Sequence, residues 1–262
     1  MFRCWITLRR AGWAIVSGAH VALLIGGGVV AGIVNTLAGA GSLLTVPLLV
    51  LVGLPGTVAN GTNRVGVLCQ NIAAAWRFRA EGMSGLRSAG PAVVPVGLGA
   101  FTGAFIISRV ADKTFETLFG LVMVLLLIPI LLRPAAATAP DAGRRWPAAV
   151  SSLVFVAVGL YGGAFQAGVG IALLFALSYA GDDLVHANSV KVVVNAALTL
   201  VALPVFIVQQ QVAWVPGALL AAGFVLGGVV GVRLAVHGGE RIIRPVLAVA
   251  VLALAGRMVG IY

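Results

Sequence analysis

A short pattern of small and polar residues occurs twice in the sequence, and each copy ends in a cation within an apolar stretch. Each has a Gly-x-Gly segment, then an Ala-Asn step, then the cation; the members are Gly39, Gly41, Asn60 and Arg64 in one copy and Gly168, Gly170, Asn188 and Lys191 in the other. The Gly-x-Gly segments stand 129 positions apart and the Ala-Asn steps 128. The matched polar residues are amides, hydroxyls and cations, with no carboxylate in register. This chemistry suits an anion, and matched Gly-interrupted segments in a membrane protein indicate a substrate site.

The two cations admit two interpretations. A cation at the centre of a membrane helix costs at least about 2.5–3.5 kcal/mol, whereas near a helix end it can extend to the interface as an anchor. The repetition favours a pair of substrate-binding cations, because Arg64 and Lys191 both follow an Ala-Asn step at an expected helix start. Asn60 and Asn188 are predicted to cap these helices, whose free N–H groups attract anions.

The Gly-x-Gly segments are predicted to interrupt helices and to expose backbone N–H donors, with simple close packing as the alternative. Further polar residues surround them, and Asn195 lies four residues beyond Lys191 on the same helix face. Gln70 and Asn71 suit either a pore lining or hydrogen bonds between helices. The predicted substrate-binding residues are Asn35, Thr36, Gly39, Gly41, Ser42, Asn60, Thr62, Asn63 and Arg64 in the first half, and Gln166, Gly168, Gly170, Asn188, Lys191 and Asn195 in the second.

The composition shows which solvent surrounds these residues. Of the 262 residues, 61% are hydrophobic and 9% are charged, and the mean hydropathy is +1.11. A soluble domain carries about 25% charged residues, so lipid is the expected solvent. The net charge is +10, but the basic residues fall mostly between apolar runs, which favours lipid headgroups and topology signals over nucleic acid.

The expected fold is an all-α polytopic membrane protein with about 8–10 hydrophobic segments in two homologous halves. The halves are 1–133 and 148–262, joined by a Pro- and Ala-rich linker at 134–147. Segments 42–54 and 169–181 are too short to cross the bilayer and are predicted to be broken or re-entrant. The expected segments are 14–35, 42–54, 61–79, 90–109, 114–132, 148–166, 169–181, 188–208, 214–236 and 242–260.

Orientation stays open at this stage. Three arginines before the first apolar run, which is expected to be an uncleaved span, argue for a cytoplasmic N-terminus. Five spans per half would give an inverted repeat and four a parallel one. Small residues at Gly99-x-x-x-Gly103 and at 223–231 are predicted to be ridges where helices pack closely.

The remaining residues disfavour an enzyme. Seven acids, three histidines and two cysteines are scattered along the chain and form no expected catalytic set, metal site or disulfide. No cofactor is predicted. An anion carrier would run naturally as an exporter, because a negative interior drives anion exit by about 2.3 kcal/mol per charge per 100 mV. A channel, a membrane enzyme and a structural subunit are the alternatives.

At these motifs the chain resembles the sulfite exporter TauE/SafE family of bacterial permeases, from about residue 20 to 260. The residues that carry the resemblance are 32–42 with Pro47-Leu48-Leu49, then Asn60-Gly61-Thr62-Asn63-Arg64, and in the second half 161–165, 168–170 and 187–191. The resemblance implies a multi-pass inner-membrane transporter of a small sulfur-containing or carboxylate anion such as sulfite, a sulfonate or sulfoacetate. Its partners would be this anion and membrane lipid, with homo-oligomerisation left open. Gln166 departs from the family, in which many members carry glycine or another small residue there.

Overall fold

The computed structural model describes residues 17–132, 146–180 and 184–258, and all regular structure in these ranges is helical. The all-α class is therefore confirmed. Most of the predicted linker and the N-terminal arginines lie outside the described residues. The described helices are α2 (Gly18–Ala38), α3 (Ser42–Leu51), α4 (Gly56–Ala80), α5 (Gly90–Ile107), α6 (Asp112–Leu132), α7 (Ala148–Phe165), α8 (Val169–Ala180), α9 (Leu184–Val208) and α10 (Trp214–Met258).

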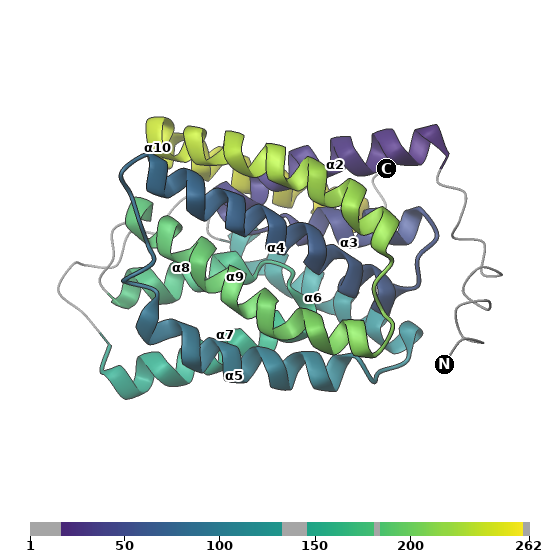
Figure 1. Cartoon of the computed structure of the whole chain (residues 1–262), viewed down its shortest axis with the longest axis horizontal. Helices are drawn as coiled ribbons and strands as arrows, with labels where there is room; N and C mark the ends of the chain where they lie inside the picture. The colour runs from purple at the N-terminus through teal and green to yellow at the C-terminus, as the bar shows by residue number, and fades with distance from the viewer. Residues whose placement is uncertain (1–16, 133–145, 181–183, 259–262) are drawn as a thin grey trace.

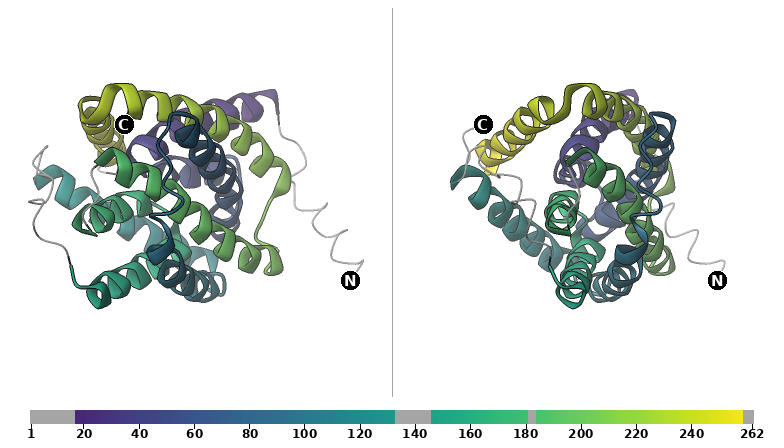
Figure 2. Two further views of the ribbon diagram at one scale, coloured as in Figure 1. Left: turned by 60° about the vertical axis from the view of Figure 1, so that its left-hand side comes forward. Right: turned by 90° about the vertical axis from the view of Figure 1, so that its left-hand side faces the viewer.

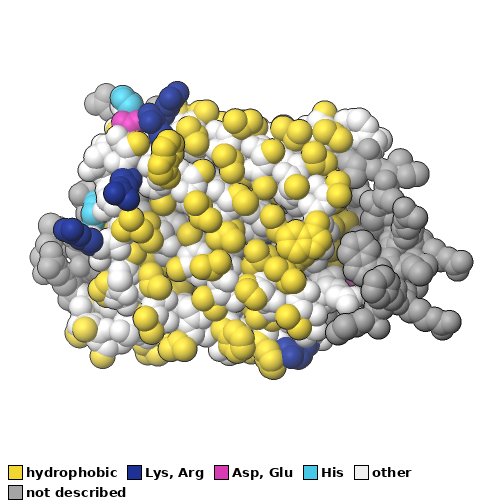
Figure 3. Space-filling view, viewed as in Figure 1, with side chains coloured by type: hydrophobic (Ala, Val, Ile, Leu, Met, Phe, Trp, Pro, Cys, Tyr) yellow, Lys and Arg dark blue, Asp and Glu magenta, His cyan; other side chains and the backbone are white. Residues whose placement is uncertain are grey.

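Five described helices are long and apolar enough to cross a membrane: α2, α5, α7, residues Val185–Val208 of α9 and Trp214–Gly238 of α10. Large hydrophobic side chains on the outside of the bundle suit contact with lipid, as at Leu153, which is 71% exposed. Figure 3 shows apolar side chains over the middle of one face and basic side chains toward its ends. Helix α4 is as long as α9 but is much less apolar: it carries seven of the 18 buried polar side chains among the described residues, and its first half is buried in the bundle.

The two short segments form the second arms of two helical hairpins, which fits the prediction of broken or re-entrant helices. Helix α2 ends at Gly39, whose φ of +75° is left-handed, and α3 begins at Ser42. Helix α7 ends at Gln166 with a φ of +60°, and α8 begins at Val169. In Figure 1, α2 runs from the right to the middle of the molecule and α3 returns to the right, whereas α7 starts at the left and α8 returns there. Two helical hairpins thus enter the bundle from opposite sides.

Glycine ridges hold the long helices together, as the spacing of small residues predicts. A Cβ atom at Gly99 of α5 would lie 2.1 Å from the carbonyl oxygen of Val156 in α7. A Cβ atom at Gly227 of α10 would lie 2.1 Å from the carbonyl oxygen of Val29 in α2. These positions accept only glycine because backbone packs directly on backbone.

The expected segment 214–236 corresponds to the candidate span Trp214–Gly238, but the expected break before 242–260 is wrong, because α10 continues as one helix to Met258. The charged stretch between the two apolar runs contains Gly238 and Gly239, which keep their backbone N–H groups and can continue a helix. Glycine pairs and prolines are also sites at which helices bend. Figure 2 shows the C-terminal part of α10 running at an angle to its first part.

Candidate functional site

The tips of the two hairpins touch at the centre of the bundle. The backbone N–H of Gly170 donates to the carbonyl of Gly39 over 3.3 Å. A Cβ atom at Gly39 would lie 2.2 Å from the Cα of Gly170, and one at Gly170 would lie 2.3 Å from the Cα of Gly39. The two Gly-x-Gly segments therefore meet in space. The N–H groups of Gly41 and Gly170 both have protein partners, since that of Gly41 donates to the Asn35 Oδ1.

Arg64 projects from α4 to the C-terminal end of α7. It is 0% exposed, and its Nη1 donates to the Gly162 carbonyl over 3.2 Å and to the Gln166 Oε1 over 2.8 Å. Its Nη2 donates to the carbonyls of Gly163 and Ala164 over 2.5 and 3.3 Å. The guanidinium carbon lies 4.5 Å from the ring centroid of Phe206. A cation is favoured at this end of a helix, where the unpaired carbonyls carry partial negative charge.

Lys191 makes the reciprocal contact, from α9 to the C-terminal end of α2. It is 1% exposed, and its Nζ donates to the carbonyls of Asn35 and Thr36 over 3.2 and 2.8 Å. Each cation therefore binds the C-terminal end of a hairpin helix that belongs to the other half of the sequence: Arg64 binds α7, and Lys191 binds α2. Neither cation reaches the surface.

The predicted capping by Asn60 and Asn188 is wrong. Helix α4 begins at Gly56 and α9 at Leu184, so both asparagines lie inside their helices. The helical conformation of α4 already includes Thr57 and the residues after it. Its start is capped by Asp112 of α6, which accepts from the backbone N–H of Thr57 over 3.0 Å. Arg64 consequently lies more than two turns into α4 and not in its first turn.

Amide and hydroxyl side chains connect the hairpins to α4 and α9. The side chain of Asn35 donates to Gln70, which donates to Thr36 over 2.6 Å. Asn63 donates to Ser42 over 2.9 Å and accepts from Thr45 over 2.6 Å. In the second hairpin, Gln166 donates to Asn195 over 2.9 Å and to Thr199 over 3.3 Å.

The structure thus brings together most of the predicted site residues. Thr62 is an exception, because it accepts from the backbone N–H of Ala213 at the start of α10. Sequence reasoning missed Thr199 and Phe206. Thr199 could have been found, because it continues the face of Lys191 and Asn195 by a further four residues.

The chain matches the family model "Sulfite exporter TauE/SafE" over residues 24–258. It belongs to this family. It is 26% identical over 232 residues to "Probable membrane transporter protein ORF9" of Sinorhizobium sp, covering 88% of this chain and 89% of the relative. It is also 26% identical to a "Probable membrane transporter protein" of Haemophilus influenzae, covering 91% of this chain and 94% of the relative.

A third relative is "Probable membrane transporter protein YfcA" of Escherichia coli strain K12, 26% identical over 221 residues, which are 84% of this chain and 82% of the relative. No solved structure matches. This TauE/SafE-family chain is a multi-pass membrane transporter and not an enzyme. Within its described residues, no group of three or more His, Cys, Asp or Glu could hold a metal ion.

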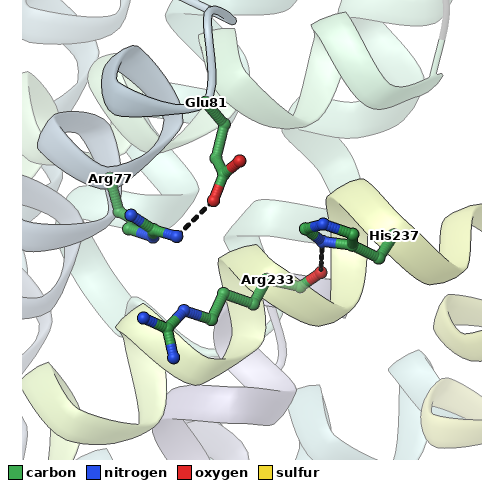
Figure 4. A network of polar contacts seen from close by, with 4 residues as sticks. All are labelled: Arg77, Glu81, Arg233 and His237. Atoms are coloured by element: carbon green, nitrogen blue, oxygen red, sulfur yellow. Dashed lines mark hydrogen bonds and ion pairs between the residues drawn. The ribbon is translucent and has the colours of Figure 1, made fainter.

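Basic side chains gather at one end of this transporter, where α4 ends (Figure 3). Arg77 forms an ion pair with Glu81 there, and His237 contacts the carbonyl of Arg233 over 2.9 Å on the neighbouring α10 (Figure 4). Among the described residues, the opposite end carries Arg109 and Lys113 together with the acids Asp112 and Glu116.

Proposed function

We propose that this transporter exports a small sulfur-containing or carboxylate anion, such as sulfite, a sulfonate or sulfoacetate, across the inner membrane. The observation that carries the proposal is the charge of the interior: among the described residues, the buried polar side chains include Arg64 and Lys191 but no carboxylate. A charged residue inside a membrane protein marks a substrate or ion pathway. The two positive charges are complementary to a small anion.

The same contacts suggest how an anion would act. Arg64 and Lys191 donate to helix-end carbonyls, which carry only partial negative charge. A full negative charge is a better partner for a cation, because charge-assisted hydrogen bonds are about twice as strong as neutral ones. A bound anion would therefore draw the N–H groups away from α7 or α2 and release that hairpin tip.

The two hairpins enter from opposite sides, and we take this as support for an inverted repeat of the halves 1–133 and 148–262. Alternating access would then rock one half against the other around the hairpin tips. Counted on the described residues, the positive-inside rule favours the cytoplasm for the end with Arg77, Arg79 and Arg233. The start of α2 would consequently face the periplasm, contrary to the expectation drawn from the N-terminal arginines.

The test is anion flux in proteoliposomes. Sulfite, sulfoacetate, sulfate and lactate are supplied in turn with an imposed potential, to wild type, Arg64→Gln and Lys191→Gln. Arg109→Gln is the matched control, because Arg109 is a cation that lies exposed over the ring of Phe105. Potential-driven flux of one anion class that is lost in either interior variant and retained in the control supports the proposal. Flux that is absent for every anion, or indifferent to both interior substitutions, refutes it.

A further inference from the structure

The interior contains polar atoms that have no partner in the protein. Among the described residues, six buried side-chain N or O atoms lack a hydrogen bond, and four of them belong to Asn60, Arg64 and Asn188. These are residues of the two matched motifs. An unpaired buried polar atom costs roughly 1–3 kcal/mol, so their gathering at the motifs points to a ligand.

The chemistry of the unpaired atom at Asn60 follows from its neighbour. The amide of Asn60 meets the carbonyl oxygen of Ala164 over 2.8 Å. A carbonyl oxygen can only accept, so the amide nitrogen must face it. The Oδ1 is consequently the unpaired atom, and it can only accept a hydrogen bond.

An unpaired donor lies one helical turn further along the same helix. The Nε–H of Arg64 has no partner, although the two Nη groups of this residue are fully engaged with α7. Residues four apart on a helix are neighbours on one face. Asn60 and Arg64 therefore offer a ligand one acceptor and one charge-assisted donor.

The second motif repeats this combination. Both amide atoms of Asn188 are unpaired, and the residue is 1% exposed. Lys191 lies three residues further on α9, on the same face of that helix. The second cation thus also has an unused acceptor and an unused donor beside it.

We infer that the transported anion carries a hydroxyl group, or the O–H of a singly protonated oxyanion, which donates to the Oδ1 of Asn60 in one half or to that of Asn188 in the other, while its charge is held by the cation on the same helix. The inference rests on the proposed function and narrows its substrate class. An anion without an O–H presents only acceptors to an amide oxygen, and two acceptors facing each other in a buried site are unfavourable. A hydroxysulfonate, a hydroxy acid or hydrogensulfite fits this arrangement, whereas a plain sulfonate does not.

The experiment compares two anions that differ only at this group. Isethionate is 2-hydroxyethanesulfonate, and propane-1-sulfonate replaces its hydroxyl with a methyl group; both stay ionised, so leakage of a neutral acid does not interfere. Flux of each is measured in proteoliposomes with wild type, Asn60→Leu and Asn188→Leu. Asn71→Leu is the matched control, since it removes another buried amide of α4, seven residues beyond Arg64. The thermal shift that each anion produces in detergent is a second readout and requires no variant.

We expect wild type and the control to prefer isethionate by about 10–100-fold, which corresponds to one unpaired polar atom. Asn60→Leu or Asn188→Leu should reduce this preference to about threefold or less. Equal flux and equal thermal shifts of the two anions in wild type would overturn the inference while leaving anion transport intact. A preference that survives both substitutions would also overturn it, since water would then satisfy these atoms. Flux of neither anion, nor of sulfite or lactate, would instead refute the proposed function.

Discussion

Arg64 and Lys191 occupy corresponding places at the two hairpins but bind them differently. Arg64 reaches four acceptors at the end of α7 and lies against the ring of Phe206. Lys191 reaches two carbonyls at the end of α2. A guanidinium holds several acceptors in a fixed plane, whereas an ammonium is a compact point charge on a flexible stem. The comparison suggests that the α7 hairpin is held firmly and that the α2 hairpin is released more easily.

The neighbouring side chains strengthen this difference. One acceptor of Arg64 is the side chain of Gln166, which is itself tied to Asn195 and Thr199. Lys191 is bound to backbone carbonyls alone, and one of them, that of Asn35, already accepts from the backbone N–H of Gly39 over 2.7 Å. Loss of either cation would leave one carbonyl with a partner, because the Gly162 carbonyl at Arg64 likewise accepts from the backbone N–H of Gln166 over 3.0 Å. The difference between the cations therefore rests on the number of acceptors and on the side chain of Gln166.

The strongest test of the comparison is Arg64→Gln. The substitution removes charge-assisted hydrogen bonds to four acceptors, and we expect it to lower the free energy of unfolding by about 4 kcal/mol, at roughly 1 kcal/mol per acceptor. It should also abolish anion flux. Thermal unfolding in detergent and flux in liposomes measure the two effects. Arg64→Lys keeps the charge but loses the planar fork, so it should fall between wild type and the glutamine variant; stability equal to wild type in both variants would contradict the fixed role of Arg64.

The next largest effect is expected at the contact between the hairpin tips. Gly170→Ala places a Cβ atom 2.3 Å from the Cα of Gly39, so one hairpin must move. Overpacking of this kind costs about 1–3 kcal/mol, and the displaced tips should lower the transport rate at least tenfold. Gly26→Ala is the control, because no atom lies within 4 Å of the added methyl group. If both alanine variants transport equally well, the tips do not need to touch during the cycle.

Lys191→Met should cost less stability than Arg64→Gln. Methionine keeps the length and apolar stem of lysine, and the substitution removes two hydrogen bonds, so we expect a loss of about 2 kcal/mol. Anion flux should still be lost, because the charge is absent. Thermal unfolding of the two variants side by side gives the difference directly. A larger loss for Lys191→Met than for Arg64→Gln would reverse the assignment of the firm and the releasable hairpin.

Much of the fold follows from the sequence, because long apolar runs and their Gly-rich interruptions fix where membrane helices begin and end. Segments 42–54 and 169–181 are predicted to be broken or re-entrant, and the structure has the separate short helices α3 and α8 there. The caps were not predictable from local pattern. Asn60 has the type and setting of a capping residue, but Asp112, 55 positions from Thr57, performs that role. Such a contact depends on how α6 packs against α4, so the local sequence around Asn60 contains no pattern that predicts it.

The candidate site was predictable in its members but not in its connections. Repetition of the motif singled out both cations and both asparagines, because polar residues in apolar stretches are conspicuous. Periodicity along one helix does not tell which helix end a side chain will reach. The crossing of Arg64 to α7 and of Lys191 to α2 arises only when the hairpins enter from opposite sides.

The smallest expected effect concerns Gln166, the residue that departs from the family pattern. Its φ of +60° strains a side chain, and glycine there would relieve about 1 kcal/mol. Glycine would also remove the hydrogen bonds to Arg64, Asn195 and Thr199, while the three carbonyl contacts of Arg64 would remain. The two effects oppose each other, so Gln166→Gly should change the free energy of unfolding by less than about 1 kcal/mol.

Gln166→Ala separates the two contributions, because alanine loses the same hydrogen bonds but keeps the strained φ. We expect it to be less stable than the glycine variant by about 1 kcal/mol in thermal unfolding. Each Gln166 variant is then combined with Arg64→Gln and, separately, with Lys191→Met. If Gln166 helps Arg64 to hold α7, the free energies of unfolding of the two double variants should differ by less than those of Arg64→Gln and Lys191→Met alone. An unchanged difference would mean that the backbone carbonyls of α7 alone make the Arg64 hairpin the firmer of the two.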